Sequence, residues 1–393
     1  MMEYRLCDNP WGEEELLAIQ KVMDTGMFTM GEQVKTFEAL FAQKFSTKHA
    51  IMVSSGSAAN LLAIAALVYS GRLPRGSEVI VPAVSWSTTY APLEQFGMKV
   101  VFVDIDPDTL NISVESLRKA ITSQTRMLLL VNLLGNPNQF DEIFALIEGK
   151  NILVMEDNCE SFGAEYKGKM LGTLGLVGTF SSFYSHHICT MEGGVVVTEN
   201  TELYEYMLSL RAHGWTRNLS EGSSIYQKSR DAFFESFHFI LPGFNLRPLE
   251  MEGAIGIEQL QKMEKIIFQR RENAAYFQKK MKTFPNIRIQ KEVGVSSWFG
   301  FSIVLTGILG EKRNWLVQKL AEANVEVRPI VAGNFTRNPV IKYMDHSIPY
   351  PLTVSDEIHD HGFFIGNHSK CNHEEVDYFA KILNQLCEEA VIK

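Results

Sequence analysis

A pair of neighbouring histidines is the first feature of this chain that could do chemistry. His186 and His187 stand in the stretch SSFYSHHICTMEGG, residues 181–194, after a predicted strand that leads to Ser181 and before a Gly-Gly pair. An imidazole titrates near neutral pH, so it can accept a proton and return it. Adjacent histidines in a loop also serve simply as hydrogen-bonded side chains, so the pair alone leaves both interpretations open.

A second motif could bind a phosphate group. The stretch Ser54-Ser55-Gly56-Ser57 lies between a predicted strand and a predicted helix. Backbone N–H groups at a helix N-terminus, next to small hydroxyl side chains, bind phosphate well. The alternative interpretation is an ordinary helix N-cap followed by a turn glycine.

Two further residues could contact a flat cofactor. Asp157 follows the apolar run 151–157, and a carboxylate at a strand end can hold a proton on a ring nitrogen. Trp86, in PAVSWSTTY, could stack on such a ring. The alternatives are a helix-capping aspartate and a tryptophan of the core.

The cysteines and the remaining histidines predict no metal centre. The five cysteines are scattered, without the close spacings of a zinc or iron–sulfur site. The stretch HDHG at 359–362 offers two histidines at i and i+2, too few ligands for a zinc site. We therefore expect no bound metal and no iron–sulfur partner.

The elements that must position these residues form an α/β pattern. Helical patterns separate several of the apolar runs, which lie at 50–53, 78–83, 99–105, 126–134, 151–157, 179–184 and 194–199. Near-continuous apolar strands alternating with helices are typical of a mostly parallel sheet, here seven-stranded, that is buried on both faces. Open α/β sheets bind ligands at the ends of their strands, where the motifs above are expected.

The pattern changes after the sheet. We predict a large α/β domain over 1–245, which begins with an N-terminal helix, and a long connecting helix within 246–285. A small C-terminal α/β domain is expected over 286–393. Its strands are predicted near 287–290 and 298–305, and its helices near 312–323 and 374–386.

Composition narrows the class of protein. The chain has 393 residues and a formal net charge of −9, and no long Lys/Arg run predicts a nucleic-acid surface. The most apolar stretches, such as residues 61–69, are too short to span a bilayer, and the N-terminus does not resemble a signal peptide. We expect a cytoplasmic protein with no nucleic-acid or membrane partner.

Taken in order, the motifs resemble a known family. The segments VSSGSAANLL, VPAVSWSTTY, VNLLGNPN, EDNCES, GTFSSFYSHHICTMEGG, RAHGWTRNL and LPGFNLRPLEMEGAIGIEQL look like those of the pyridoxal-phosphate-dependent sugar-nucleotide aminotransferases (DegT/DnrJ/EryC/StrS). The resemblance covers nearly the whole chain and is weakest at 219–235 and after about residue 335. It implies the aspartate-aminotransferase fold, fold type I.

One position departs from the family's aminotransferases. They carry a cofactor-binding lysine five residues after the serine, whereas this chain has His186 there and no lysine between Lys169 and Lys228. A histidine cannot form a Schiff base. Within the family, the motifs of this chain resemble those of a dehydratase that removes the C3 hydroxyl of GDP-4-keto-6-deoxymannose.

In such a dehydratase, pyridoxamine 5′-phosphate is regenerated from pyridoxal 5′-phosphate by L-glutamate. The acid/base group would be His186, with His187 as a structural neighbour. A register error of one residue would exchange the two roles.

The resemblance also implies the residues that hold the cofactor. Gly56, Ser57 and Ser181 would bind its phosphate, Trp86 would stack on its ring and Asp157 would pair with its pyridinium nitrogen. Glu160 would stand beside the ring hydroxyl, at a position where aminotransferases often carry glutamine, so that this chain departs from the family pattern there.

Other residues would act across a subunit interface. Asn245 would reach the phosphate bound by a neighbouring subunit, which implies a homodimer with shared active sites. His213 and Arg217 would also cross the interface and meet glutamate or the sugar nucleotide. Arg247 and Arg328 are further candidates, because arginine suits carboxylate and phosphate groups.

Three alternatives stay open. The protein could be a 4-aminotransferase of sugar nucleotides, although the missing lysine argues against this. It could be a 3-dehydrase of another nucleotide sugar, since no residue identifies the base. It could also be a sensor that binds a cofactor or sugar nucleotide without turnover.

Overall fold

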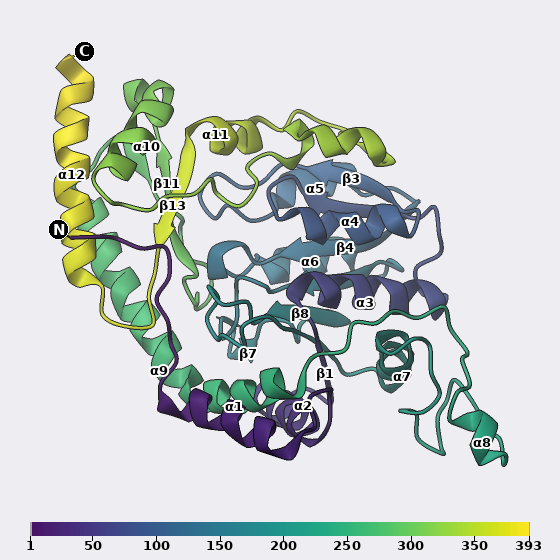
Figure 1. Ribbon diagram of the computed structural model, residues 1–393. Helices are drawn as coiled ribbons and strands as arrows, with labels where there is room; N and C mark the ends of the chain where they lie inside the picture. The colour runs from purple at the N-terminus through teal and green to yellow at the C-terminus, as the bar shows by residue number, and fades with distance from the viewer. Residues whose placement is uncertain (1, 393) are drawn as a thin grey trace.

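The computed structural model describes residues 2–392 and is built on an eight-stranded sheet with the order β1-β9-β8-β5-β4-β2-β3-β12 (Figure 1). Its strands β9 and β8 pair antiparallel, as do β1 and β9, and the other pairs are parallel. The predicted α/β class is confirmed. Seven strands match the apolar runs: β1 (His49–Val53), β2 (Glu78–Pro82), β3 (Lys99–Val103), β4 (Thr125–Val131), β5 (Leu153–Asp157), β8 (Val177–Ser181) and β9 (Gly194–Thr198).

The prediction of seven strands was wrong by one. The eighth strand, β12 (His346–Ser347), pairs in parallel with Val100 and Val101 of β3 at the sheet edge. A strand of two residues has no alternation pattern that could reveal it. It forms because the chain returns to the sheet, where the Val100 N–H donates to the Asp345 carbonyl at 2.9 Å.

Helices cover both faces of the sheet, which explains why its strands are apolar throughout. One face packs against α3 (Gly56–Tyr69), α4 (Ser87–Gln95) and α7 (Thr201–Arg211). The other face packs against α2 (Glu32–Lys44), α5 (Val114–Ala120), α6 (Phe140–Ile147) and α9 (Glu250–Met281). Helix α1 (Glu13–Thr25) lies on α9 (Figure 1).

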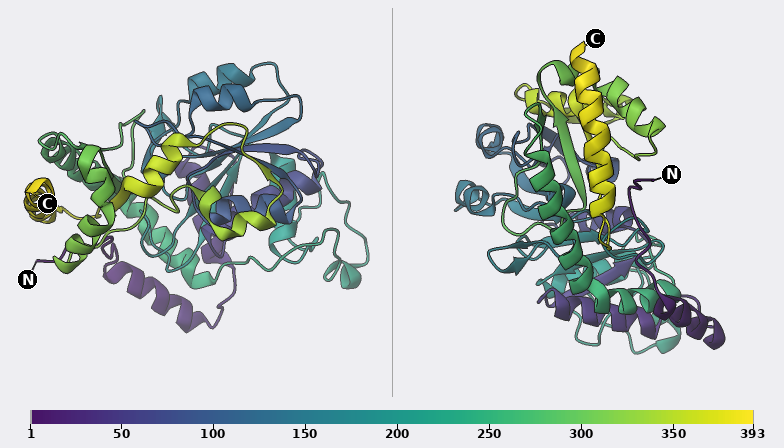
Figure 2. Two further views of the ribbon diagram at one scale, coloured as in Figure 1. Left: turned by 90° about the horizontal axis from the view of Figure 1, so that it is seen from above. Right: turned by 90° about the vertical axis from the view of Figure 1, so that its left-hand side faces the viewer.

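Helix α9 continues from the large sheet into a second, smaller unit (Figure 2). This unit has an antiparallel sheet of β10 (Ile287–Arg288), β11 (Gly300–Leu305) and β13 (Gly362–Gly366). Helices α9, α10 (Arg313–Glu322) and α12 (His373–Ile392) pack against it. Strand β13 and helix α11 (Thr353–His361) were not predicted. The domain boundaries themselves stay a prediction.

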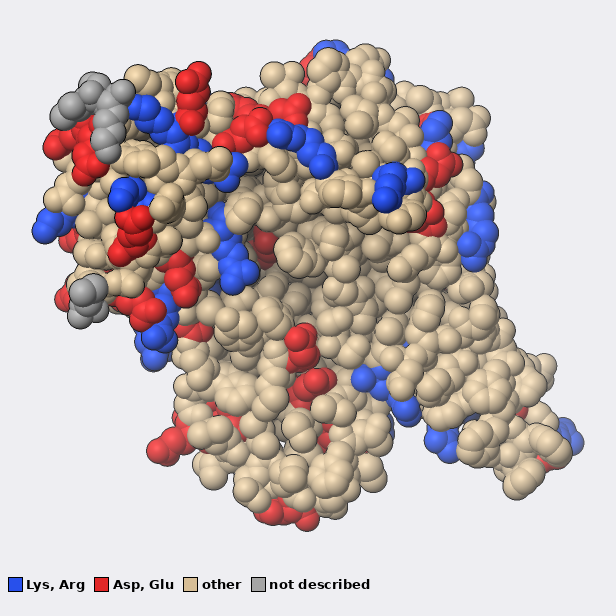
Figure 3. Space-filling view, turned by 45° about the horizontal axis from the view of Figure 1, so that its top comes forward, with Lys and Arg blue, Asp and Glu red and all other residues tan. Residues whose placement is uncertain are grey.

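The remaining short elements lie outside the two main sheets. Strands β6 (Glu165–Tyr166) and β7 (Lys169–Met170) form a two-stranded ribbon, and α8 (Ala232–Glu235) sits in the long loop before α9. No helix in the described part of the chain is both long and apolar enough to cross a membrane. Figure 3 shows acidic and basic side chains interspersed around a largely uncharged middle of one face.

Strand register brings the chemical motifs to one edge of the sheet. Asp157 at the end of β5 pairs with Val131 of β4 and with Thr179 of β8. Two residues further along β8, Ser181 pairs with Gly194, which in turn pairs with Val53 at the end of β1. The strand ends therefore place the motifs of three segments side by side, as expected for an open α/β sheet.

Candidate active site

A cavity of about 680 Å³ opens at this edge of the sheet. Its walls come from the strand ends, the N-terminal segment and the C-terminal unit. It brings together eight of the twelve residues predicted for the site: Gly56, Ser57, Trp86, Asp157, Glu160, Ser181, His186 and Arg328.

The first wall is the N-terminus of α3. Ser55 caps this helix, because its Oγ accepts a hydrogen bond from the Ala58 N–H at 3.0 Å. A Cβ at Gly56 would lie 2.6 Å from Ser181 Cβ and 2.9 Å from Cys159 Sγ, so only glycine fits there. The Ser57 hydroxyl is 2.7 Å from the Thr88 hydroxyl. Free N–H groups at a helix start, with hydroxyls around them, fit a phosphate group.

Asp157 is held firmly in the cavity by its neighbours. Its Oδ2 accepts hydrogen bonds from Asn60 Nδ2 at 2.9 Å and from Thr89 Oγ1 at 2.8 Å. The Thr179 hydroxyl donates to Asn60 Oδ1 at 2.7 Å and so fixes the amide orientation. A carboxylate oriented in this way fits a protonated ring nitrogen.

Two other carboxyl groups near Asp157 differ in their surroundings. Glu156 is directed away from the cavity and accepts hydrogen bonds from the N–H groups of Gly172, Leu174 and Gly175 at 2.9, 2.8 and 2.7 Å. This makes it a structural residue, and burial raises its pKa. Glu160 lines the cavity and accepts one hydrogen bond from the Leu134 N–H at 2.9 Å. Burial raises its pKa to about 7.

The two histidines have different environments. His186 lines the cavity, whereas the ring of His187 is fully buried and its Nε2 is 3.1 Å from the Ser297 carbonyl oxygen. Burial, with a smaller effect of the nearby Arg270, lowers the pKa of His186 to about 3. The His186 imidazole is therefore neutral at physiological pH, and it is a weaker base than a free imidazole.

Trp86 and Arg328 are far apart in the sequence, but both line this cavity. Trp86 precedes α4 and is 59% exposed, so it is a surface of the cavity and not a core residue. Arg328 comes from the C-terminal unit, where its backbone pairs with Phe364 of β13 at 2.8 and 3.0 Å. Its exposed guanidinium is available to an anionic ligand.

The other four predicted residues are absent from the described lining of this cavity. His213, Arg217 and Arg247 all contact the ring of Trp215, with the two guanidinium carbons 5.2 and 5.8 Å from its centroid. Asn245 Oδ1 accepts a hydrogen bond from Arg247 Nε at 3.0 Å. These residues form a separate polar cluster next to the exposed aromatic side chains Phe237 and Phe239, whose rings contact Trp215.

Several residues that line the cavity were not predicted from the sequence. Cys7 of the N-terminal segment, Tyr184, Phe299 and Glu326 all line the cavity. The Leu6 N–H donates to Glu326 Oε2 at 2.8 Å, across 320 positions of sequence. No local pattern marks these residues, because only the tertiary fold brings them to the site.

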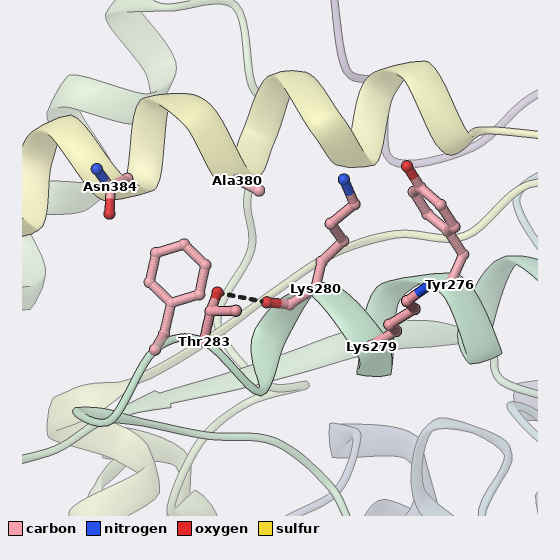
Figure 4. Close-up of a pocket in the computed structure, with 7 residues that line it drawn as sticks. Tyr276, Lys279, Lys280, Thr283, Ala380 and Asn384 are labelled. Atoms are coloured by element: carbon pink, nitrogen blue, oxygen red, sulfur yellow. Dashed lines mark hydrogen bonds between the residues drawn. The ribbon is translucent and has the colours of Figure 1, made fainter.

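A second groove lies between α9 and α12 (Figure 4). Its described lining contains Lys279 and Lys280 but no histidine, cysteine or carboxylate that could serve as a base or nucleophile. Lys280 Nζ is paired with Asp377 at 2.5 Å and lies 5.1 Å from the ring centroid of Tyr276. We therefore place the candidate active site in the cavity that contains His186.

Two known proteins that are more than half identical to this chain are dehydratases of a GDP-sugar. GDP-4-keto-6-deoxy-D-mannose 3-dehydratase of Escherichia coli is 53% identical over 387 residues, covering 98% of this chain and 100% of the relative. The enzyme of the same name from Yersinia pseudotuberculosis is 54% identical over 389 residues, covering 98% and 99%.

Solved structures agree with these similarities. The E. coli enzyme with bound hydrated PLP superposes with a TM-score of 0.95 at 53% identity, covering 98% of this chain and 100% of the other. A variant of a similar enzyme, with a histidine changed to lysine and the preceding serine changed to asparagine, gives 0.94 at 53% identity, covering 96% and 100%. The sequence pattern of the DegT/DnrJ/EryC1/StrS aminotransferases matches residues 10–384. This chain belongs to the DegT/DnrJ/EryC1/StrS aminotransferase family.

Proposed function

We propose that this protein removes the C3 hydroxyl of GDP-4-keto-6-deoxymannose to give GDP-4-keto-3,6-dideoxymannose. The cofactor would be pyridoxamine 5′-phosphate, regenerated from pyridoxal 5′-phosphate by L-glutamate. One observation carries the proposal: His186 lines the cavity at the position of the family's lysine, and no lysine is among its described lining residues. Two relatives that match almost the full length of this chain are named as this dehydratase, which supports the proposal.

The residues of the cavity would hold the cofactor without a covalent bond. Gly56, Ser57 and Ser181 would bind its phosphate, Asp157 its ring nitrogen and Trp86 one face of its ring. When bound, the cofactor would supply an amino group for the C4 carbonyl of the sugar and an electron-accepting ring. Glu160, with its raised pKa, would be the neighbour of the ring hydroxyl.

His186 would carry the proton transfer. Its imidazole would accept a proton from the carbon that joins the cofactor's amino group to its ring, and would pass it to the C3 hydroxyl, which leaves as water. His187 would be the structural neighbour, since its Nε2 is occupied by the Ser297 carbonyl. In the solved variant of a relative, the histidine that was changed to lysine directly follows a serine. In this chain only His186 of the pair does so, after Ser185, which supports His186 as the base and His187 as its neighbour.

The polar cluster outside the cavity would serve the site of a second subunit. Asn245 would reach the partner's bound phosphate, while His213, Arg217 and Arg247 would meet glutamate or the sugar nucleotide. Their position next to exposed aromatic side chains supports an interface there. Arg328 would bind the sugar nucleotide within its own subunit.

We infer the guanine base of the substrate from the names of the two relatives. The cytoplasmic location stays a prediction from the sequence. A second candidate function is a 4-aminotransferase, favoured by the family's general chemistry and disfavoured by the missing lysine.

Analysis of the reaction product tests this function. The protein would be incubated with pyridoxal 5′-phosphate, L-glutamate and GDP-4-keto-6-deoxymannose, and the sugar nucleotide examined by mass spectrometry. We expect a product that lacks one oxygen, together with ammonia and 2-oxoglutarate. A product with an amino group at C4 would establish the aminotransferase instead, and no product would reject both functions for this substrate.

A further inference from the structure

The ring of His186 is held by aromatic contacts where a catalytic histidine ordinarily has a hydrogen bond. Its centroid lies 5.0 Å from that of Phe299 at an interplanar angle of 62°, and 5.8 Å from that of Phe183 at 81°. Its Nδ1 is buried and has no hydrogen-bond partner among the described residues. A general-base imidazole is usually oriented by an acceptor at its second nitrogen. Here the edge-to-face rings are what limits its rotation.

The backbone at Trp298 explains why Phe299 points to His186. Trp298 has a φ of +48°, which is rare for a bulky side chain, and its N–H donates to Ser296 Oγ at 3.1 Å. The Trp298 ring is buried in the core of the C-terminal unit, whereas Phe299 lines the cavity. Because of this unusual backbone conformation, the two consecutive aromatic side chains lie in different places, one in the core and one in the cavity. Such a conformation persists only where the surroundings hold it.

Those surroundings fix both backbone groups of Phe299. Its N–H donates to the Leu134 carbonyl at 2.9 Å, and its carbonyl accepts a hydrogen bond from Arg270 Nη1 at 3.1 Å. Asn367 Nδ2 donates to the Trp298 carbonyl at 2.8 Å. Arg270 is buried, with 2% exposure, so this attachment is shielded from water. The Phe299 ring therefore has a defined position relative to the large sheet.

We propose that Phe299 is the positioning residue of the proposed base: its ring sets the orientation of the His186 imidazole and keeps water from Nδ1. The inference rests on the proposed function, because that function makes His186 the base. The charged group that affects the pKa of His186 is Arg270 on α9, and His187 lies beside it. The cavity walls also carry Glu160, Glu192, Asp157, Glu326 and Arg328. Burial is the main cause of the lowered pKa, so opening the site by removal of the ring would favour a protonated imidazole.

Three variants test the proposal. Phe299→Leu keeps an apolar side chain but removes the ring, and Phe299→Tyr keeps the ring. Phe144→Leu is the matched control, because Phe144 is half-buried on α6, has a ring contact with Phe140 at 5.8 Å and lies outside the described cavity lining.

We expect Phe299→Leu to lower kcat for dehydration by about 10- to 100-fold, with KM changed by less than about threefold, because a small displacement of a base is costly. Phe299→Tyr and Phe144→Leu should stay within about threefold of the natural protein in kcat. An unchanged kcat in Phe299→Leu would overturn the proposal. Parallel losses in kcat, KM and thermal stability would show a merely structural role and would also overturn it.

A second readout needs neither substrate nor cofactor. The histidine resonances of the cofactor-free, ¹⁵N-labelled protein would be followed by NMR between about pH 5 and 8, around the ordinary histidine pKa. His186 should not titrate in this range in the natural protein or in Phe299→Tyr, but should titrate in Phe299→Leu. Unchanged behaviour in Phe299→Leu would overturn the positioning role. If the natural protein yields no dehydrated product, the proposed function fails, whereas the NMR comparison still decides the role of Phe299.

Discussion

At the scale of single residues, burial moves the pKa values of two titratable groups of the site in opposite directions. Burial lowers the pKa of His186 to about 3 and raises that of Glu160 to about 7. A neutral imidazole and a carboxyl group that retains its proton near neutrality can therefore line one cavity. Groups whose environments move their pKa values in opposite directions are a common basis for acid/base catalysis.

The raised pKa of Glu160 predicts a pH-dependent cost to stability. Between its ordinary pKa of 4.5 and about 7, this carboxyl binds more protons in the folded state than in the unfolded state. Its contribution to stability is thus present below pH 4.5 and is lost as the pH rises through 7. Glu160→Gln should therefore be more stable than the natural protein at pH 8 by about 1–3 kcal/mol and nearly equal to it at pH 5.

Chemical denaturation of the cofactor-free protein at the two pH values measures this difference. The exposed Glu221→Gln change is the control, because Glu221 lies in the loop outside the described cavity lining. It should give the same stability difference at both pH values. A Glu160→Gln effect that does not grow between pH 5 and 8 would mean that this carboxyl is ionised throughout.

At the scale of elements, the sequence predicted the parts of the site that depend on local structure. Gly56, Asp157 and Ser181 each stand at a strand end or helix start, where an apolar run changes into polar residues. β12 could not be predicted in this way, because its pairing depends on the return of the chain to Val100 and Val101. β13 was missed although its residues are largely apolar, since a short apolar run alone does not identify a strand.

The start of α3 predicts a specific effect of adding one methyl group. In Gly56→Ala, the new Cβ would meet Ser181 Cβ at 2.6 Å, so the helix start or the serine must move. We expect affinity for pyridoxal 5′-phosphate to fall by at least about tenfold, because each displaced hydrogen bond to a charged group contributes about 1.5–3 kcal/mol. Absorbance titration with the cofactor measures this loss.

Gly222→Ala is the matched control for that change. A Cβ at Gly222 would meet no atom within 4 Å, and its φ lies outside the left-handed region. It should bind the cofactor as the natural protein does. Equal affinities for Gly56→Ala and Gly222→Ala would show that the start of α3 does not hold the phosphate.

At the scale of the whole molecule, residues from three distant parts of the chain make one cavity. The N-terminal segment supplies Cys7, and the C-terminal unit supplies Phe299, Glu326 and Arg328. Of these four residues, only Arg328 was predicted from the sequence, through the family resemblance. Cys7, Phe299 and Glu326 were not predicted. Contacts such as Leu6 N–H to Glu326 Oε2 leave no periodic signal in the sequence.

The proposed sharing of active sites between two subunits predicts complementation between two inactive chains. His186→Gln would lack the base, and Arg217→Ala would lack a residue that serves the partner's cavity. A mixed dimer would contain one site with both residues intact, so random mixing should restore about a quarter of the natural activity. The two variants would be unfolded and refolded together, with each refolded alone as a control. Activity no higher than that of the separate variants would contradict shared sites.

The rate of C3 deoxygenation by His186→Gln, compared with the rate by His187→Gln, tests most directly whether His186 transfers the proton. We expect His186→Gln to lose about 10²- to 10⁴-fold in kcat, the contribution typical of a general acid/base group, while it still binds the cofactor. His187→Gln should lose stability through its contact with Ser297 but keep a kcat within about tenfold of the natural value. Deoxygenation at the natural rate by His186→Gln would contradict the role of His186 as the base, because proton transfer would then depend on another group.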